Sequence, residues 1–423
     1  MIKEDIRKKV VERFERYVKI ETTSDRHSDT FPTTSCQLDL SRMLKDELNS
    51  IGVNDVEIDQ NGFLIARIPA NIKQENLPRG ISPGKIPVIG LMAHVDTADA
   101  VSGKNVKPIL HDNYNGNVIK LKNGHKLDPD EFPQLLNFKG DTIITSDGTT
   151  LLGADDKAGI AEIMTAIEYL LSNRDIPQPE IEVVFTPDEE TGKGMSRFPL
   201  KRMKMKYCYT VDGGAAGSIE IESFNAYRTE ITLTGKNIHP GYARGKMINS
   251  IRMASKLIEL IPQAESPEAT DGRFGYYHPI MISGKPEETK VEIYIRDFDD
   301  ETARRRIETL REACRAVEKA FPGSSAVLRD EKQYSNMYMY IKKEPKIVSY
   351  LEEAVKKAGL EPKVEFIRGG TDGSQLSEMG IPTPNIFAGG YNFHSRLEWI
   401  PVSSMVKATE TLVNLMELWG SKG

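Results

Sequence analysis

Two histidines and several acids occupy the same kind of position in this chain, directly after an apolar segment or at the start of a helix. They are His94, Asp155, the pair Glu189 and Glu190, Asp212 and His394. Imidazole nitrogens and carboxylate oxygens are ligands by which proteins hold zinc and similar divalent ions. The set is too large for one catalytic zinc, and it suits two ions about 3.5–4 Å apart that share a bridging carboxylate.

Each of these residues also has a purely structural explanation. Asp155 follows a glycine turn and precedes a helical pattern, so its carboxylate could cap the helix. A lone histidine such as His94 is often a strand-end residue, and acids after a strand are usually just solvated. The metal hypothesis is favoured because the carboxyl ends of strands in an open, mostly parallel sheet face one crevice, where ligands bind. Asp96, two positions after His94, is then suited to orienting that imidazole.

The segments that carry these residues predict the elements of an α/β fold. The apolar runs that lead to the candidate ligands have the continuous hydrophobic character of strands buried on both faces. Helical spacing of apolar residues predicts helices around them. The strands are expected at 87–96, 180–190, 207–214 and 384–394, and the helices at 1–18, 40–51, 158–171 and 347–357. The prediction is a mostly parallel sheet with flanking helices and a hairpin around Asn61-Gly62.

The middle of the chain, about 224–336, has a different pattern of apolar residues. Its apolar pattern predicts strand, helix, strand, strand, helix and strand, which is the ferredoxin-like split arrangement. We therefore expect a catalytic domain in two parts, 1–223 and 337–423, with an inserted lid or dimerisation domain at 224–336. Two residues of the insert could take part in chemistry: His239, in a His-Pro-Gly turn, and Arg296, at a strand end. Alternatively, His239 packs locally and Arg296 pairs with a neighbouring aspartate.

Bulk composition excludes several classes of function. The chain has 423 residues, a net charge of −6 and no long basic run, so nucleic acid is not an expected partner. No apolar run is long enough to span a bilayer, and 1–18 is an amphipathic helix rather than a signal peptide. The three cysteines are widely spaced, which is typical of a reducing cytoplasm and not of a disulfide framework. We expect a cytoplasmic protein that does not bind membranes.

Seven short motifs, in order along most of the chain, resemble those of the peptidase T family. They are Ala93-His-Val-Asp-Thr97, Leu152-Gly-Ala-Asp-Asp-Lys-Ala-Gly159, Pro187-Asp-Glu-Glu-Thr-Gly192, Tyr209-Thr-Val-Asp-Gly-Gly214, His239-Pro-Gly241, Arg368-Gly-Gly-Thr-Asp-Gly373 and Gly389-Gly-Tyr-Asn-Phe-His394. That family consists of cytoplasmic tripeptide aminopeptidases within the di-zinc exopeptidase superfamily, which includes carboxypeptidase G and aminoacylase. The His-x-Asp and Glu-Glu pairs mark the superfamily. The His-Pro-Gly turn and the Ile-Arg-Gly-Gly-Thr-Asp-Gly run point to the narrower family.

The resemblance implies a role for each matching residue. The ligands of two zinc ions per subunit would be His94, Asp155, Glu190, Asp212 and His394, with Asp155 bridging. Glu189 would be the general base, Asp96 would orient His94, and His239 would come from the lid to stabilise the oxyanion. Arg296, Asn336 and Arg368 would bind the substrate. The implied activity is release of the N-terminal residue from unblocked tripeptides, with the lid closing about hinges near 223 and 336.

Other functions remain open on the sequence alone. A dipeptidase or an N-acyl amino acid deacylase would use the same di-metal machinery, because substrate preference lies in the loops and the lid. A non-catalytic binding module would be expected to lack the base or a ligand, and none is missing here. The segments 71–86 and Ser395-Arg-Leu-Glu-Trp399 depart from the family pattern, and we expect them to alter the pocket without touching a ligand. An exposed edge strand and helix of the lid could pair two chains into a homodimer.

Overall fold

The computed structural model of the chain describes residues 2–77 and 82–423. The chain forms two compact units. Unit 1 comprises Met1–Ile221, Tyr340–Glu365 and Thr371–Gly423, and unit 2 comprises Glu222–Met339 and Phe366–Gly370. In the sequence, unit 2 lies mostly between two stretches of unit 1, and it also takes the short segment Phe366–Gly370, which we had expected in the last domain. The divergent segment 71–86 lies partly outside the described residues.

Unit 1 is built on an eight-stranded sheet with the strand order β1-β2-β8-β3-β9-β16-β10-β15. The central strands β8 (Ile181–Thr186), β3 (Ile89–His94), β9 (Tyr207–Gly213) and β16 (Asn385–Phe387) are parallel to one another. The outer strands are β1 (Asp55–Ile58), β2 (Leu64–Ile68), β10 (Ser218–Glu222) and β15 (Lys363–Phe366). β1 and β2 form the predicted antiparallel hairpin, and β2 runs antiparallel to β8.

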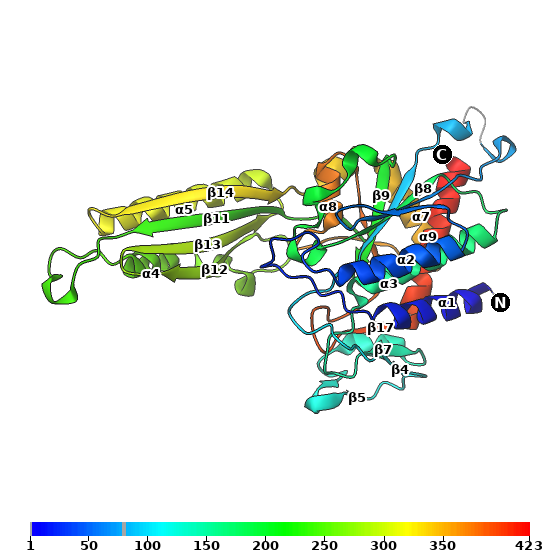
Figure 1. Cartoon of the computed structure of the whole chain (residues 1–423), viewed down its shortest axis with the longest axis horizontal. Coiled ribbons are helices and arrows are strands. Elements are labelled where there is room, and N and C mark those ends of the chain that lie inside the picture. The colour runs from blue at the N-terminus through cyan, green and yellow to red at the C-terminus, as the bar shows by residue number, and fades with distance from the viewer. Residues whose placement is uncertain (1, 78–81) are drawn as a thin grey trace. The chain divides into compact units, whose positions relative to one another are not determined.

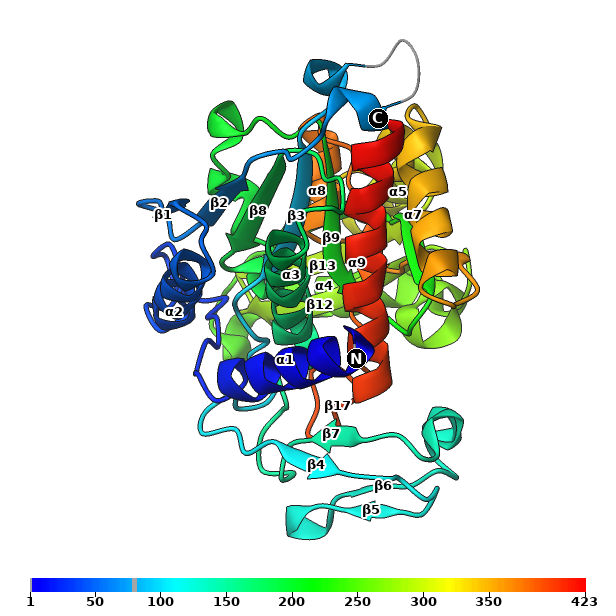
Figure 2. The same cartoon turned by 90° about the vertical axis from the view of Figure 1, so that its right-hand side faces the viewer.

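Helices cover both faces of this sheet. They are α1 (Ile2–Tyr17), α2 (Gln37–Ser50), α3 (Ala154–Ser172), α7 (Pro345–Lys357), α8 (Asp372–Glu378) and α9 (Val402–Lys422). The single turn α6 (Tyr338–Ile341) spans the point in the sequence where unit 2 ends and unit 1 resumes. Figure 2 shows α3 and α9 side by side over one face. On that face Trp419 of α9 donates a hydrogen bond of 3.0 Å to the hydroxyl of Tyr209. On the other face Met92 and Cys208 pack with Leu376 of α8.

The helix α9 was not predicted from the sequence. Its buried residues lie all around it and include small polar side chains such as Ser404, Thr409 and Thr411. A helix that is enclosed on several sides has no continuous polar face, so the amphipathic pattern that reveals surface helices is weak. No described helix of the chain is both long and apolar enough to cross a membrane.

The segment between β3 and α3 forms a small appendix to unit 1. Its strands β4 (Ile109–His111) and β7 (Ile143–Thr145) form an antiparallel sheet in the order β17-β7-β4 with β17 (Trp399–Pro401), which follows His394 in the chain. The hairpin of β5 (Ile119–Lys120) and β6 (Lys126–Leu127) lies between β4 and β7 in the sequence. Trp399 and Tyr391 stack with ring centroids 4.3 Å apart. This appendix therefore anchors the segment that contains His394.

Unit 2 has the ferredoxin-like order that the sequence predicted. Its elements are β11 (Asn225–Thr234), α4 (Ser250–Leu260), β12 (Tyr276–Gly284), β13 (Glu288–Asp297), α5 (Asp300–Ala320) and β14 (Ser325–Tyr334). The strands form one antiparallel sheet in the order β12-β13-β11-β14. Apolar residues of the sheet, α4 and α5 form a buried core within this unit. Figure 1 labels these elements. The mostly parallel central strands with flanking helices, together with the ferredoxin-like unit, confirm the predicted α/β fold class.

One buried acid in unit 1 has no evident structural partner. Glu162, on α3, is fully buried, and among the described residues neither of its carboxylate oxygens has a hydrogen-bond partner. Burial raises its pKa well above the ordinary value of 4.5. The folded chain therefore holds this proton to a higher pH than the unfolded chain does. Glu162 consequently destabilises the fold increasingly as the pH rises above 4.5.

We predict that Glu162→Met, which removes the carboxyl group at similar length, raises the free energy of unfolding at pH 7 by about 1–3 kcal/mol. The gain should shrink as the pH falls toward 4.5, because the unfolded chain then keeps the proton as well. Urea unfolding of both proteins at the two pH values measures this difference. An equal gain at both would show that Glu162 does not stay protonated in the folded chain.

Candidate metal centre

The carboxylate of Asp155 lies between two histidines that are distant in sequence. Its Oδ1 is 2.9 Å from Nε2 of His94, and its Oδ2 is 3.0 Å from Nε2 of His394. His94 ends β3, Asp155 lies in the first turn of α3, and His394 belongs to the loop after β16. The three elements therefore bring one carboxylate to two imidazoles, which is the arrangement expected of a bridging ligand.

The other two predicted ligands complete one group around each histidine. Asp212, near the end of β9, places Oδ1 3.7 Å from Nε2 of His94. Glu190 places Oε1 2.9 Å from Nε2 of His394. The structure thus brings all five residues together, as one group of His94, Asp155 and Asp212 and another of His394, Asp155 and Glu190.

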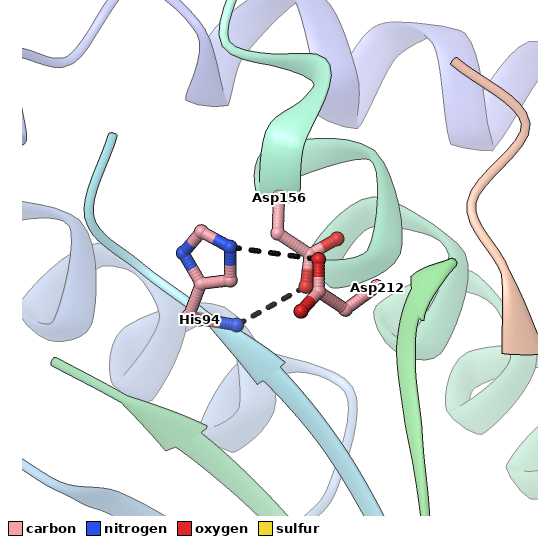
Figure 3. A group of neighbouring side chains, drawn as sticks. All are labelled: His94, Asp156 and Asp212. Atoms are coloured by element: carbon pink, nitrogen blue, oxygen red, sulfur yellow. Dashed lines mark hydrogen bonds and ion pairs between the residues drawn. The ribbon is translucent and has the colours of Figure 1, made fainter. Parts of the chain in front are cut away.

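Asp156 also belongs to this cluster, and we did not predict it. With His94 and Asp212 it offers oxygen and nitrogen atoms that all lie within 4.8 Å of one another. Its Oδ2 accepts a hydrogen bond of 3.1 Å from the backbone N–H of His94. Figure 3 shows the side chains of Asp156 and Asp212 approaching His94 from α3 and β9. The signal in the sequence was its position directly after Asp155, which we interpreted as part of a helix start.

Asp96 contacts both His94 and the turn that carries Glu189 and Glu190. Its fully buried carboxylate is 3.4 Å from Nδ1 of His94 and accepts hydrogen bonds from the backbone N–H groups of Glu189 and Glu190, at 3.0 and 3.1 Å. The same turn is fixed from its other side by Asp188, which has a φ of 61° and accepts a hydrogen bond of 2.7 Å from Gln37. Asp96 therefore positions the two glutamates as well as His94.

Burial and mutual contact shift the pKa values of the acids and histidines in the cluster. Burial raises the pKa of Glu190 to about 7, with the negative charge of Asp155 adding to this effect. Burial also raises the pKa of Asp212, and that of Glu189 well above its usual range. Hydrogen bonds to Asp155 and Glu190 raise the pKa of His394 to about 10. Glu189, Glu190 and Asp212 are thus costly to ionise unless a positive charge lies beside them, whereas the hydrogen bonds from His394 and His94 lower the pKa of Asp155.

These residues suit a divalent cation. Across residues 2–77 and 82–423, the ion-pair partners of Asp155, Asp212 and Glu190 are histidines, and no lysine or arginine neutralises them. Oδ1 of Asp156 is buried and has no hydrogen-bond partner within the described chain. A mixed set of imidazole and carboxylate ligands favours zinc and similar ions over calcium or magnesium, which prefer oxygen ligands.

Two of the predicted lid residues have partners within unit 2. His239 is exposed, and its Nδ1 accepts a hydrogen bond of 3.2 Å from the backbone N–H of Gly241. Arg296 donates to the carbonyl oxygens of Tyr227 and Ile295, at 3.3 and 3.0 Å. It does not pair with Asp297, which pairs with Arg306 instead. His239 therefore keeps its second ring nitrogen available for another group.

The remaining two predicted substrate-binding residues are heavily engaged in unit 2. Asn336 uses its whole hydrogen-bonding capacity, because its oxygen accepts from the N–H groups of Ser223 and Tyr338 while its nitrogen donates to Glu222 and Phe298. Arg368 donates to Gly272, Phe274 and Thr270 in the loop before β12. In this conformation both residues hold the backbone of unit 2, and a role in substrate binding stays a prediction.

Sequence reasoning missed one further residue of the site. Glu398 lies in the segment that we expected to leave the ligands untouched, and this expectation was wrong. Its buried Oε1 accepts a hydrogen bond of 3.1 Å from the backbone N–H of Asp155. A single acid between Leu397 and Trp399 carries no motif by itself, so only the fold reveals this contact.

The central strands of the sheet thus end at a cluster of histidines and buried acids, and this arrangement suits a peptide hydrolase built around a metal centre. A family model described as "Peptidase family M20/M25/M40" matches residues 145–418. The chain belongs to this family.

Near full-length relatives show which members of this family the chain is similar to. The chain is 48% identical to peptidase T of Bacillus subtilis (strain 168), over 97% of this chain and 98% of the relative. It is 44% identical to peptidase T of Clostridium perfringens (strain 13 / Type A), over 98% and 100%. These matches confirm the resemblance drawn from the motifs.

Solved structures share the fold. A tripeptidase from Staphylococcus aureus matches with a TM-score of 0.77 and 20% identity, covering 98% of this chain and 99% of that one. The YXEP protein of Bacillus subtilis, a dinuclear metal binding peptidase of the M20 family, matches with a TM-score of 0.67 and 14% identity, covering 99% and 100%.

We predict that stripping divalent ions with a chelator lowers the melting temperature, and that Asp155→Asn abolishes most of this difference. A cation bound only by the folded chain stabilises it by about 2.7 kcal/mol when the free ion is at 100 times its Kd. Asp155 is shared by both groups, so neutralising it weakens both. Melting curves with Zn²⁺ and with chelator measure the effect.

The matched control is Asp147→Asn. Asp147 is also a buried aspartate, but it bonds to Lys122 and Thr149 outside the cluster. This variant should keep the full zinc-dependent shift. A wild-type shift in Asp155→Asn would contradict the assignment of Asp155 as a ligand.

Proposed function

We propose that this chain is a metallo-aminopeptidase that releases the N-terminal residue from unblocked tripeptides. The observation that carries the proposal is the position of Asp155 between His94 and His394, at 2.9 and 3.0 Å. The near full-length relatives named peptidase T support the substrate class. A peptide is therefore the expected partner of the site.

Two zinc ions per subunit are the cofactors that we infer. His94 and Asp212 would hold one ion, Glu190 and His394 would hold the other, and Asp155 would be shared. Two such ions supply a water of lowered pKa and polarise the scissile carbonyl. The chain's own contribution is to keep five ligand side chains in place, with Asp96 orienting His94 through its Nδ1 side.

Glu189 is the general base in this proposal. It would take a proton from the attacking water and return it to the leaving amine. The two adjacent glutamates would have different roles, because Glu190 lies 2.9 Å from His394 and would be a metal ligand, whereas Glu189 would be the base. Asp96 accepts from both of their backbone N–H groups, so the two side chains leave a common, fixed turn.

Unit 2 would act as the lid. His239 would stabilise the oxyanion, an effect typically worth about 3 kcal/mol, and Arg296 would bind the substrate. Both roles require the lid to present these residues to the centre by closing about hinges near 223 and 336. A homodimer paired through an edge of the lid sheet, and a cytoplasmic location, also stay predictions.

The alternative is a dipeptidase or an N-acyl amino acid deacylase with the same metal machinery. A panel of four compounds separates these activities: a free tripeptide, the same tripeptide with a blocked N-terminus, a dipeptide and an N-acetyl amino acid. We expect zinc-dependent release of the N-terminal residue from the free tripeptide alone. Cleavage of the acetylated compound instead would move the protein to the deacylases.

We predict that Glu189→Gln keeps zinc binding and lowers kcat by about 10²–10⁴-fold, because it removes only proton transfer. Glu190→Gln is the matched variant, with the same change one residue along the chain. It should lower zinc affinity, because Glu190 is a ligand. Zinc stoichiometry and steady-state kinetics of both variants measure the split. A Glu189→Gln variant with much of the wild-type turnover would rule out Glu189 as the base.

A further inference from the structure

Glu398 binds the backbone of the turn that carries Asp155. Its Oε2 accepts hydrogen bonds from the N–H groups of Leu152 and Gly153, at 2.7 and 2.8 Å, and its Oε1 accepts from Asp155 at 3.1 Å. The carboxylate is 1% exposed, so water does not compete for these bonds. One buried side chain thus satisfies three N–H groups within four consecutive residues.

These N–H groups would otherwise lack partners. Gly153 is the residue before α3, and it has no side chain that could cap the helix. It also adopts a φ of +83°, which turns the chain sharply at this point. The first N–H groups of a helix need external acceptors. Glu398 supplies an acceptor from 243 residues further along the chain.

Glu398 is also tied to the second histidine. It lies four residues after His394, in a loop closed by backbone hydrogen bonds between Tyr391 and Trp399 at 2.9 and 3.1 Å. The amide of Asn392 donates to the carbonyl oxygen of Leu397, which braces the loop across its middle. His394 itself has a φ of 58°, a conformation that a non-glycine residue keeps only when its surroundings hold it.

We propose that Glu398 is a positioning residue that sets the distance between Asp155 and His394, and thereby the affinity of the centre for its ions. It joins the two ligand-bearing segments through the backbone of the Asp155 turn, in addition to the direct contact of 3.0 Å between the side chains of Asp155 and His394. The inference rests on the proposed function, because it requires Asp155 and His394 to be metal ligands.

Glutamine cannot replace this carboxylate. The three N–H donors approach both oxygens, and a glutamine amide offers one oxygen and one NH₂ group, which is itself a donor. At least one buried N–H would face another N–H in Glu398→Gln. The turn at 152–155 must then shift, and the carboxylate of Asp155 shifts with it. Changes to groups that hold metal ligands typically lower metal affinity about 10–100-fold.

The experiment is a zinc titration of chelator-stripped protein at 25 °C against a chromophoric competitor. Wild type, Glu398→Gln and the control Glu162→Gln are compared. Glu162 is also a buried glutamate, but it has no partner near the turn among the described residues. We expect Glu398→Gln to bind zinc about 10–100-fold more weakly and Glu162→Gln to bind as the wild type does. The visible spectrum of the Co²⁺ forms should change only in Glu398→Gln.

A purely capping role would give a different result. It would lower the melting temperature of the metal-free protein and leave zinc affinity and the Co²⁺ spectrum at wild-type values, which would overturn the inference. If Glu398→Gln does not fold, Glu398→Asp keeps the charge but is too short to reach all three N–H groups, and the same affinity loss is expected. A wild type that binds no zinc would overturn the proposed function, and this inference with it.

Discussion

Carboxylates crowded together out of water are the constraint on which the rest of unit 1 depends. Asp155, Glu190 and Asp212 lie within a few ångströms of two histidines, and no lysine or arginine of the described chain pairs with them. Buried acids of one sign repel one another and lose hydration, so the folded chain carries them at a cost. A bound cation removes this cost. The site is therefore better explained as a binding site for positive charge than as a set of structural ion pairs.

A second set of acids keeps the first set in place by binding the backbone. Asp96 holds the turn of the two glutamates, Asp156 accepts from the N–H of His94, and Glu398 holds the turn of Asp155. Glu220 does the same beyond Asp212, where it accepts from the N–H of Gly214 at 3.3 Å. Backbone N–H groups stabilise these charges without bringing in a competing cation. The side chains of the candidate ligands are thus left available to bind an ion.

Unit 2 has a different balance of forces. Its sheet and helices enclose their own apolar core, and its polar residues of interest are mostly bonded within it. Asn336 and Arg368 donate hydrogen bonds to backbone carbonyl groups of unit 2, whereas the side chain of His239 is exposed. Of the residues predicted for the lid, His239 is thus the one whose side chain is least committed to the architecture.

The sequence by itself was sufficient to predict the central strands and the ferredoxin-like order of unit 2, and it singled out the five ligand candidates that the fold brings together. Buried parallel strands are continuous apolar runs, and a histidine or acid directly after such a run is visible in one dimension. The helix α9 escaped prediction because burial on several sides removes the amphipathic pattern.

The contacts of Asp156 and Glu398 and the structural engagement of Asn336 were decided only by the tertiary structure. Glu398 reaches a turn 243 residues away. No local pattern encodes such a pairing, because it depends on how the loop after β16 packs against the start of α3. Single polar residues acquire their roles from the backbone groups that folding places beside them.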